Sequence, residues 1–145
     1  MTLRSARYPA TRYRLEAPPD LSARAERERL SAPALAAFFN IMTRWQVKDE
    51  EARALLGGVS NGPFYEMKRH PDRLLETDRL TRISYLVGIF KALRILHSQS
   101  LADEWVHLSN AHPIFGGRTP LAYMIAGGLP AMQTVRRLLD ARRAG

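Results

Sequence analysis

The stretch from Trp105 to Gly128 constrains the fold most, because three signals for helix ends and helix starts follow one another in it. Pro113 has no backbone donor and disfavours helical dihedral angles at the residue before it, so a preceding helix ends there. The pair Gly116–Gly117 allows the positive φ angles that a tight loop requires. Thr119 before Pro120 is a strong signal for a helix start, with the threonine as N-cap. The stretch therefore predicts a helix, a loop of fixed shape and a second helix.

Apolar residues recur at helical spacing on both sides of this stretch, and no strand-like alternation occurs in the sequence. A short charged helix is expected at 23–30, and further helices at 33–45, 48–56, 61–69, 81–98, 101–108, 120–127 and 129–143. Pro33 is expected in the first turn of its helix, and Thr77 or Asp78 is expected to cap the longest helix. The sequence therefore predicts an all-α fold.

The longest predicted helix, 81–98, carries an apolar stripe wide enough to be buried on more than one side. We interpret it as the central strut of the core or of a dimer interface, and we expect dimerisation through it. Gly88 lies inside this helix and costs about 1 kcal/mol of helix propensity relative to alanine. Its presence indicates a close approach by another helix.

The formal net charge of +8 is concentrated at the two ends of the chain. Residues 1–34 hold seven arginines and four acids, residues 35–117 hold ten basic and nine acidic residues, and residues 118–145 hold five arginines and one acid. A protein that clamps DNA with its body more often carries a basic face there. Charged ends fit an acidic protein partner, phosphate contacts or solubility alone, and the charge does not choose among them.

The ordered run W-x4-N-x2-P-x-F-G-G-x-T-P-L, followed by a short helix and a glycine pair, closely resembles the toxin-binding domain of Xre/MbcA/ParS-type antitoxins. The matching residues are Trp105, Asn110, Pro113, Phe115, Gly116, Gly117, Thr119, Pro120 and Leu121. The resemblance extends from about Leu35 to the C-terminus. It implies an antitoxin whose partner is a RES-domain toxin that consumes NAD or transfers ADP-ribose from it, and whose C-terminal part covers the active site of that toxin.

The resemblance and the turn chemistry together give a candidate toxin-binding surface. Trp105 and Phe115 are expected to support the loop, and a basic end is expected to enter the toxin's cleft. The candidate residues are Trp105, Phe115, Gly116, Gly117, Arg118, Thr119, Pro120, Met124, Arg136, Arg142, Arg143 and Gly145.

A helix of about eight residues, a glycine turn and a further helix from Asn61 to Arg69 have the outline of a helix-turn-helix. The candidate DNA-binding residues are Ser60 as cap, Asn61, Tyr65, Lys68 and Arg69. Two features weaken DNA binding: Gly62-Pro63 is a poor helix opening, and Glu66 would repel phosphate. The sequence leaves DNA binding and a purely structural role for this unit equally open.

The chain is divided into three regions. Residues 1–33 are interpreted as a flexible arm, 34–80 as the helix-turn-helix-like region and 81–145 as the toxin-binding domain.

No catalytic, cofactor or metal motif is present, and no apolar run approaches the length of a membrane span. The chain has no cysteine, which suits a cytoplasmic protein. The leading hypothesis is an antitoxin that neutralises a RES-domain toxin and acts as a homodimer within the toxin complex. Repression of its own operon through operator DNA is left open, because DNA binding by the helix-turn-helix-like region is left open. A stand-alone helix-turn-helix transcription regulator is the second hypothesis, and an adjacent toxin gene would discriminate against it. An enzyme with an unfamiliar site is the third, and it would require a cleft of convergent polar groups.

Overall fold

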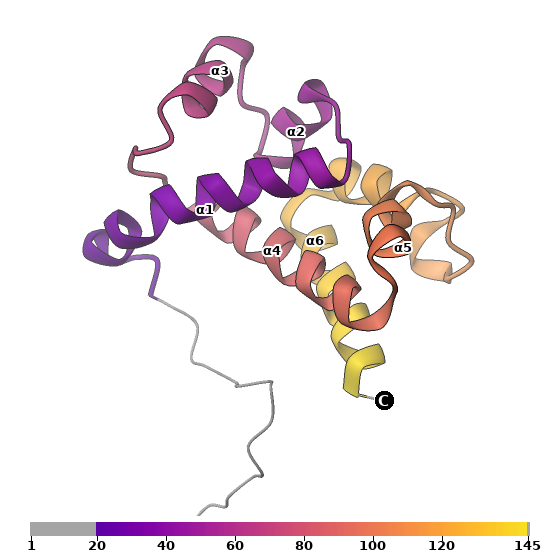
Figure 1. Cartoon of the computed structure of the whole chain (residues 1–145). Helices are drawn as coiled ribbons and strands as arrows, with labels where there is room; N and C mark the ends of the chain where they lie inside the picture. Colours follow the sequence, from indigo (N-terminus) through magenta and orange to yellow (C-terminus); the bar gives the residue numbers. More distant parts are fainter. Residues whose placement is uncertain (1–19, 145) are drawn as a thin grey trace, which may run out of the picture.

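Figure 1 shows a computed structural model of the chain, in which residues 20–144 are described. The elements in order are α1 Arg24–Arg44, α2 Asp49–Leu55, α3 Asn61–Arg69, α4 Thr77–Leu96, α5 Gln99–Glu104, η1 Trp105–His107, η2 Pro113–Phe115 and α6 Pro120–Ala144, where η denotes a 3-10 turn. No strand occurs within residues 20–144, and the predicted all-α fold class is confirmed. Residues 1–19 of the predicted flexible arm, and Gly145, lie outside the described residues, whereas the predicted end of the arm at residue 33 lies inside α1.

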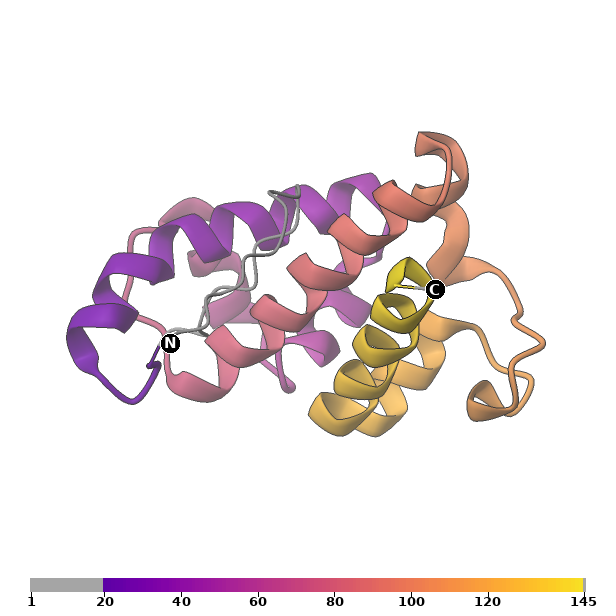
Figure 2. The ribbon, with the colours of Figure 1, turned by 90° about the horizontal axis from the view of Figure 1, so that it is seen from below.

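Helix α4 is the centre of the molecule. It packs against α1 on one side and against α6 on another, and Figure 2 shows it between these two helices. The buried residues of α4 are Leu80, Ile83, Leu86, Gly88, Ile89, Ala92 and Leu93. The wide apolar stripe predicted for this helix is therefore shared between two helices of the same chain, and its width does not require a second copy.

Helix α1 begins at Arg24, so the prediction that a helix starts at Pro33 was wrong. Proline inside a helix removes one backbone hydrogen bond and strains the preceding turn. The helix nevertheless continues through Pro33, and its first half contacts the segment before α4. The hydroxyl of buried Ser31 accepts a hydrogen bond from the backbone N–H of Leu75 at 2.9 Å and donates to the carbonyl of Arg27. The predicted helices at 23–30 and 33–45 are therefore one helix, which is held to the segment before α4 at Ser31.

Helices α2 and α3 form the predicted helix–turn–helix outline. Gly57 and Gly58 form the turn that follows α2, with φ angles of 100° and 89°. The glycine pair predicted that the helix would end here. Ser60 occupies the N-cap position of α3, although its side chain makes no capping hydrogen bond. Phe64 and Met67 are buried and belong to the same core as α4 and α6. The unit is thus an integral part of a single core.

The remaining boundaries differ from the predictions by about one turn. Helix α4 begins at Thr77 rather than Thr81, and α5 ends at Glu104, where the chain tightens into the 3-10 turn η1. Helix α6 changes direction at Gly128, whose φ of 65° and ψ of −145° are not helical, so the predicted break at the glycine pair is confirmed. None of the helices within residues 20–144 is long and apolar enough to cross a membrane.

Candidate functional site

The loop between η1 and α6 is built around Phe115, whose side chain is fully buried. Its ring meets the ring of Trp105 edge-to-face at 6.1 Å between centroids and that of Tyr123 at 5.3 Å. Aromatic pairs in this geometry are favourable because the positive edge of one ring meets the negative face of the other. Trp105 and Phe115 therefore support the loop from its core side, as the sequence predicted.

The loop backbone is held by short-range hydrogen bonds. The side-chain oxygen of Asn110 accepts from the N–H of His112 at 2.9 Å, and the Nδ1 atom of His112 accepts from the N–H of Ile114 at 3.2 Å. Thr119 Oγ1 accepts from the N–H of Ala122 at 3.1 Å, which confirms the predicted N-cap of α6. Since these bonds satisfy donors at both ends of the loop, its shape is determined before any partner arrives.

Three predicted loop residues lie on the surface. Gly116 and Gly117 are exposed, with φ angles of 57° and 83° that favour glycine. Arg118 is also exposed, and its guanidinium carbon lies 5.9 Å from the ring centre of Tyr123. A cation over an aromatic face is attracted by the ring quadrupole. These residues form an exposed basic corner ahead of α6.

Two other predicted contact residues are not on the surface. Met124 is fully buried and Pro120 is buried as well. Helix α6 lies on the core with this face, because Leu121, Met124 and the later apolar residues belong to the buried cluster that also contains residues of α4. Met124 was therefore wrongly assigned to direct contact, and it supports the surface from within.

The C-terminal half of α6 is anchored to the core as far as Leu139, which is fully buried. Beyond this point, Arg142 is exposed. Arg143 turns inward, with 18% of its side chain exposed, and its Nη1 atom lies 3.4 Å from Asp140 Oδ1. The two arginines of the predicted basic end thus have different environments. Gly145, the last residue of that set, lies outside the described part of the chain.

The candidate DNA-binding residues of α3 are exposed. Tyr65 is 59% exposed, and Ser60 and Asn61 are exposed beside it. Lys68 forms an ion pair with Asp49 at 2.9 Å, and Arg69 forms one with Glu66 at 3.5 Å. Both basic side chains of this helix are thereby already paired with acids. This pairing lowers the positive potential that phosphate binding needs.

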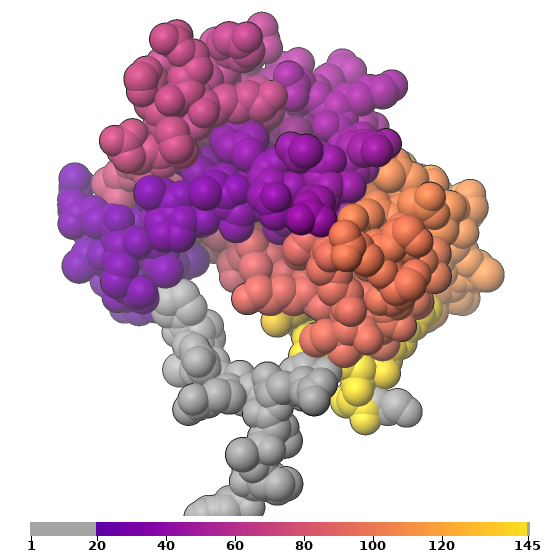
Figure 3. Space-filling view, in the orientation of Figure 1, coloured from indigo at the N-terminus to yellow at the C-terminus, as the bar shows by residue number. Residues whose placement is uncertain are grey.

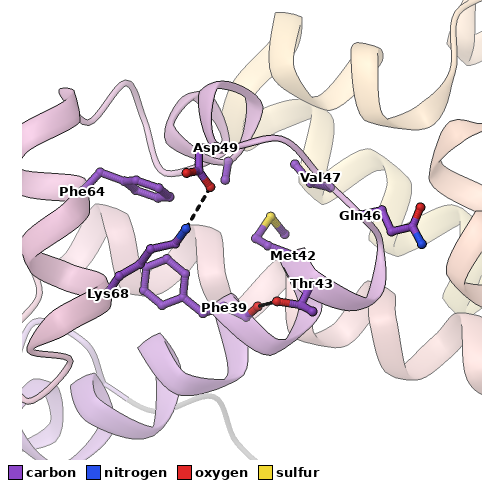
Figure 4. Close-up of a pocket in the computed structure, with 9 residues that line it drawn as sticks. Phe39, Met42, Thr43, Gln46, Val47, Asp49, Phe64 and Lys68 are labelled. Carbon is purple, nitrogen blue, oxygen red and sulfur yellow. Dashed lines mark hydrogen bonds and ion pairs between the residues drawn. The ribbon is translucent and has the colours of Figure 1, made fainter.

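Lys68 also lies at the edge of a hollow of about 150 Å³ between α1, α2 and α3 (Figure 4). Its ammonium nitrogen is 5.3 Å from the ring centre of Phe64, and the ion pair with Asp49 crosses the hollow. The hollow has an apolar floor and no set of convergent catalytic groups. In residues 20–144 no three histidine or acidic side chains gather where they could hold a metal ion.

The two candidate surfaces are far apart. Helix α3 lies at one end of the molecule and the C-terminal end of α6 at the opposite end, as the ribbon and the space-filling view show (Figures 1 and 3). One partner of modest size would not cover both. The structure therefore offers two independent surfaces on a common core.

Sequence reasoning missed several residues that organise the C-terminal surface. His112 and Tyr123 hold the loop, and Asp140 pairs with arginines from two turns of α6. At Gly88, where a close approach by another helix was predicted, the group that fills the space is the side chain of Arg136 of α6. The one signal available was that Asp140 is the only acid among residues 118–145.

Residues 91–145 match the family model of the antitoxin Xre/MbcA/ParS C-terminal toxin-binding domain. A protein from Sinorhizobium fredii (strain NBRC 101917 / NGR234), described as "Uncharacterized protein y4oB", is 35% identical over 112 residues, which cover 77% of this chain and 84% of that protein. No solved structure matches the chain. The matched region contains the last six residues of α4, the loop over Phe115 and all of α6. The chain belongs to the Xre/MbcA/ParS-type antitoxins.

Proposed function

We propose that this antitoxin neutralises a RES-domain toxin by inserting the end of α6 into the toxin's active site. The family supports a toxin as partner. The observation that carries the finer proposal is the course of α6, which is anchored by Leu139 and then runs on to present the exposed side chain of Arg142. A helix that is anchored to the core close to its end loses little conformational entropy on docking.

The chemistry of the proposed toxin fits a cation at this position. Cleavage of the bond between nicotinamide and ribose develops positive charge on the ribose, and a site that stabilises this charge offers negative groups to it. The guanidinium of Arg142 would be bound by the same groups. The exposed corner at Arg118 would then dock against the rim of the cleft, with the loop as a rigid spacer.

The proposed encounter is cytoplasmic, since a chain without cysteine suits a reducing compartment.

The homodimer is also part of the proposal. The surface that α4 leaves for a second copy is its outer face, where Ile95 is 48% exposed and Val87 is half-buried. Light scattering of the free antitoxin at micromolar concentration should give the mass of a dimer, and a monomer would remove this part of the proposal.

Repression of the antitoxin's own operator is the second element of the proposal, and the helix–turn–helix outline of α2 and α3 supports it. On binding, DNA phosphates would replace Asp49 and Glu66 as the partners of Lys68 and Arg69. If these two residues contact phosphate, replacing both by alanine should weaken binding to promoter DNA on all sequences alike and flatten its salt dependence. If the wild-type protein and its toxin complex are not retained on this DNA at low salt, α3 has a structural role only.

The neutralisation itself is tested by co-expression and by titration. The antitoxin should co-purify with the product of the adjacent gene, and it should stop that protein's consumption of NAD at a fixed stoichiometry. A chain that lacks residues 142–145 should keep its helicity, because helix ends contribute little to the core. It should bind the toxin more weakly and inhibit it incompletely. Equal inhibition by the full and the shortened chain would reject the plug and would move the blockade to the loop.

A further inference from the structure

A series of side-chain contacts that begins on α4 holds the last turns of α6. We call this series, which runs from Gly88 through Arg136 and Asp140 to Arg143, the relay. The Nε atom of Arg136 donates to Asp140 Oδ2 at 3.1 Å, and Arg143 Nη1 donates to Asp140 Oδ1 at 3.4 Å. We infer that Gly88, Arg136 and Asp140 are positioning residues, which orient the end of α6 so that Arg142 is the cation presented to the toxin. This inference rests on the proposed function and assigns roles within that surface.

The relay begins at Gly88, which is buried in the middle of α4. A Cβ atom added there would lie 1.8 Å from Arg136 Nη1 and 2.3 Å from its Cζ atom. The guanidinium therefore occupies the space that a side chain would fill, and a flat, delocalised cation suits contact with a helix backbone. Glycine is unfavourable inside a helix. Its use here is explained by the space that it leaves for Arg136.

The next step is the carboxylate of Asp140. It receives Arg136 from the preceding turn on one oxygen and Arg143 from the last turn on the other. Since Arg136 is seated on α4, its partner Asp140 is held with it, and Arg143 follows. The pairs are partly shielded, with 34% of the Arg136 side chain and 18% of the Arg143 side chain exposed.

The result is a fixed rotation of the helix end. Successive residues on an α-helix are about 100° apart, so turning Arg143 inward directs Arg142 away from the core. Arg142 has no ion pair among the described residues, whereas the acid that would neutralise it is engaged by its neighbours. The relay thus keeps the Arg142 guanidinium available for an acidic group of a partner.

The first experiment uses the free antitoxin and needs no toxin. In the wild-type protein, the arginine Nε–H signal of Arg136 in an NMR spectrum should be shifted and protected from exchange by Asp140. Gly88→Ala should remove this signature, because the added methyl group displaces only the flexible end of Arg136 and leaves the helix intact. Gly62→Ala is the matched control, since no atom lies within 4 Å of a Cβ at that position of α3. An unchanged signal in Gly88→Ala would overturn the relay.

The second experiment measures inhibition of the co-purified toxin. Gly88→Ala and Asp140→Asn should each raise the concentration needed for half inhibition by about fivefold, the upper end for a partly exposed ion pair. Neither should add to the effect of Arg142→Ala, because both act through Arg142. Additive effects at unchanged melting temperature would refute the positioning role. If the NMR signature is lost but Arg142→Ala inhibits fully, the relay exists and the plug mechanism fails.

Discussion

Replacing Phe115 by alanine is the sharpest test of the loop. The ring is fully buried and contacts Trp105 and Tyr123 edge-to-face. Removing a buried phenylalanine costs about 3–5 kcal/mol through lost transfer free energy and the cavity that remains. The two ring pairs place this site in the upper part of that range, because each adds a favourable contact beyond burial. We therefore expect the free energy of unfolding to fall by about 4 kcal/mol.

Urea denaturation followed by far-UV circular dichroism measures this loss, and the melting temperature should fall by roughly 10–15 °C in a chain of this size. Leu108→Ala is a suitable control, since Leu108 is a large apolar residue of the same loop that is 44% exposed. Its replacement should change the free energy of unfolding by less than about 0.5 kcal/mol. A loss below about 1 kcal/mol in Phe115→Ala would show that the loop is not packed on this ring.

Three further predictions concern single features. Thr119→Ala removes the N-cap of α6 and should cost about 1 kcal/mol in denaturant unfolding, whereas Thr119→Ser should cost much less. Gly128→Ala forces a side chain into a backbone conformation that is essentially restricted to glycine and should cost about 1–3 kcal/mol by the same measurement. Asp49→Ala breaks the ion pair with Lys68 and should change stability by less than about 1 kcal/mol, while raising the affinity for DNA in a low-salt filter-binding assay if α3 contacts phosphate. A stability loss well above this value would mean that the pair is more than a surface contact.

Local signals predicted the elements that are governed by local chemistry. The cap at Thr119, the turn at Gly57 and the break at Gly128 all depend on dihedral angles and donors within a few residues, and each is found where the sequence places it. The stretch from Trp105 onward was therefore predictable in outline, together with the buried support from Phe115.

Features that depend on distant residues were not predictable. Helix α1 passes through Pro33, and beside that proline Ser31 is bonded to Leu75, 44 positions later in the chain. The burial of Met124 follows from how α6 lies on the core, which periodicity alone does not specify. The same holds for Arg136, whose seat is a glycine on another helix. In each case the deciding contact joins residues that no local pattern relates.

The single core also links the two ends of the molecule thermodynamically. Phe64 and Met67 of α3 share one buried cluster with Met132, Val135 and Leu139 of α6, and α4 contributes to both sides. A ligand that binds only the folded chain adds RT ln(1 + [L]/Kd) to its stability, about 2.7 kcal/mol at one hundred times Kd. In a chain that unfolds cooperatively, this increment protects α3 as much as the helix that is bound. Toxin bound at α6 would thus lower the unfolded fraction of the distant α2–α3 unit without touching it.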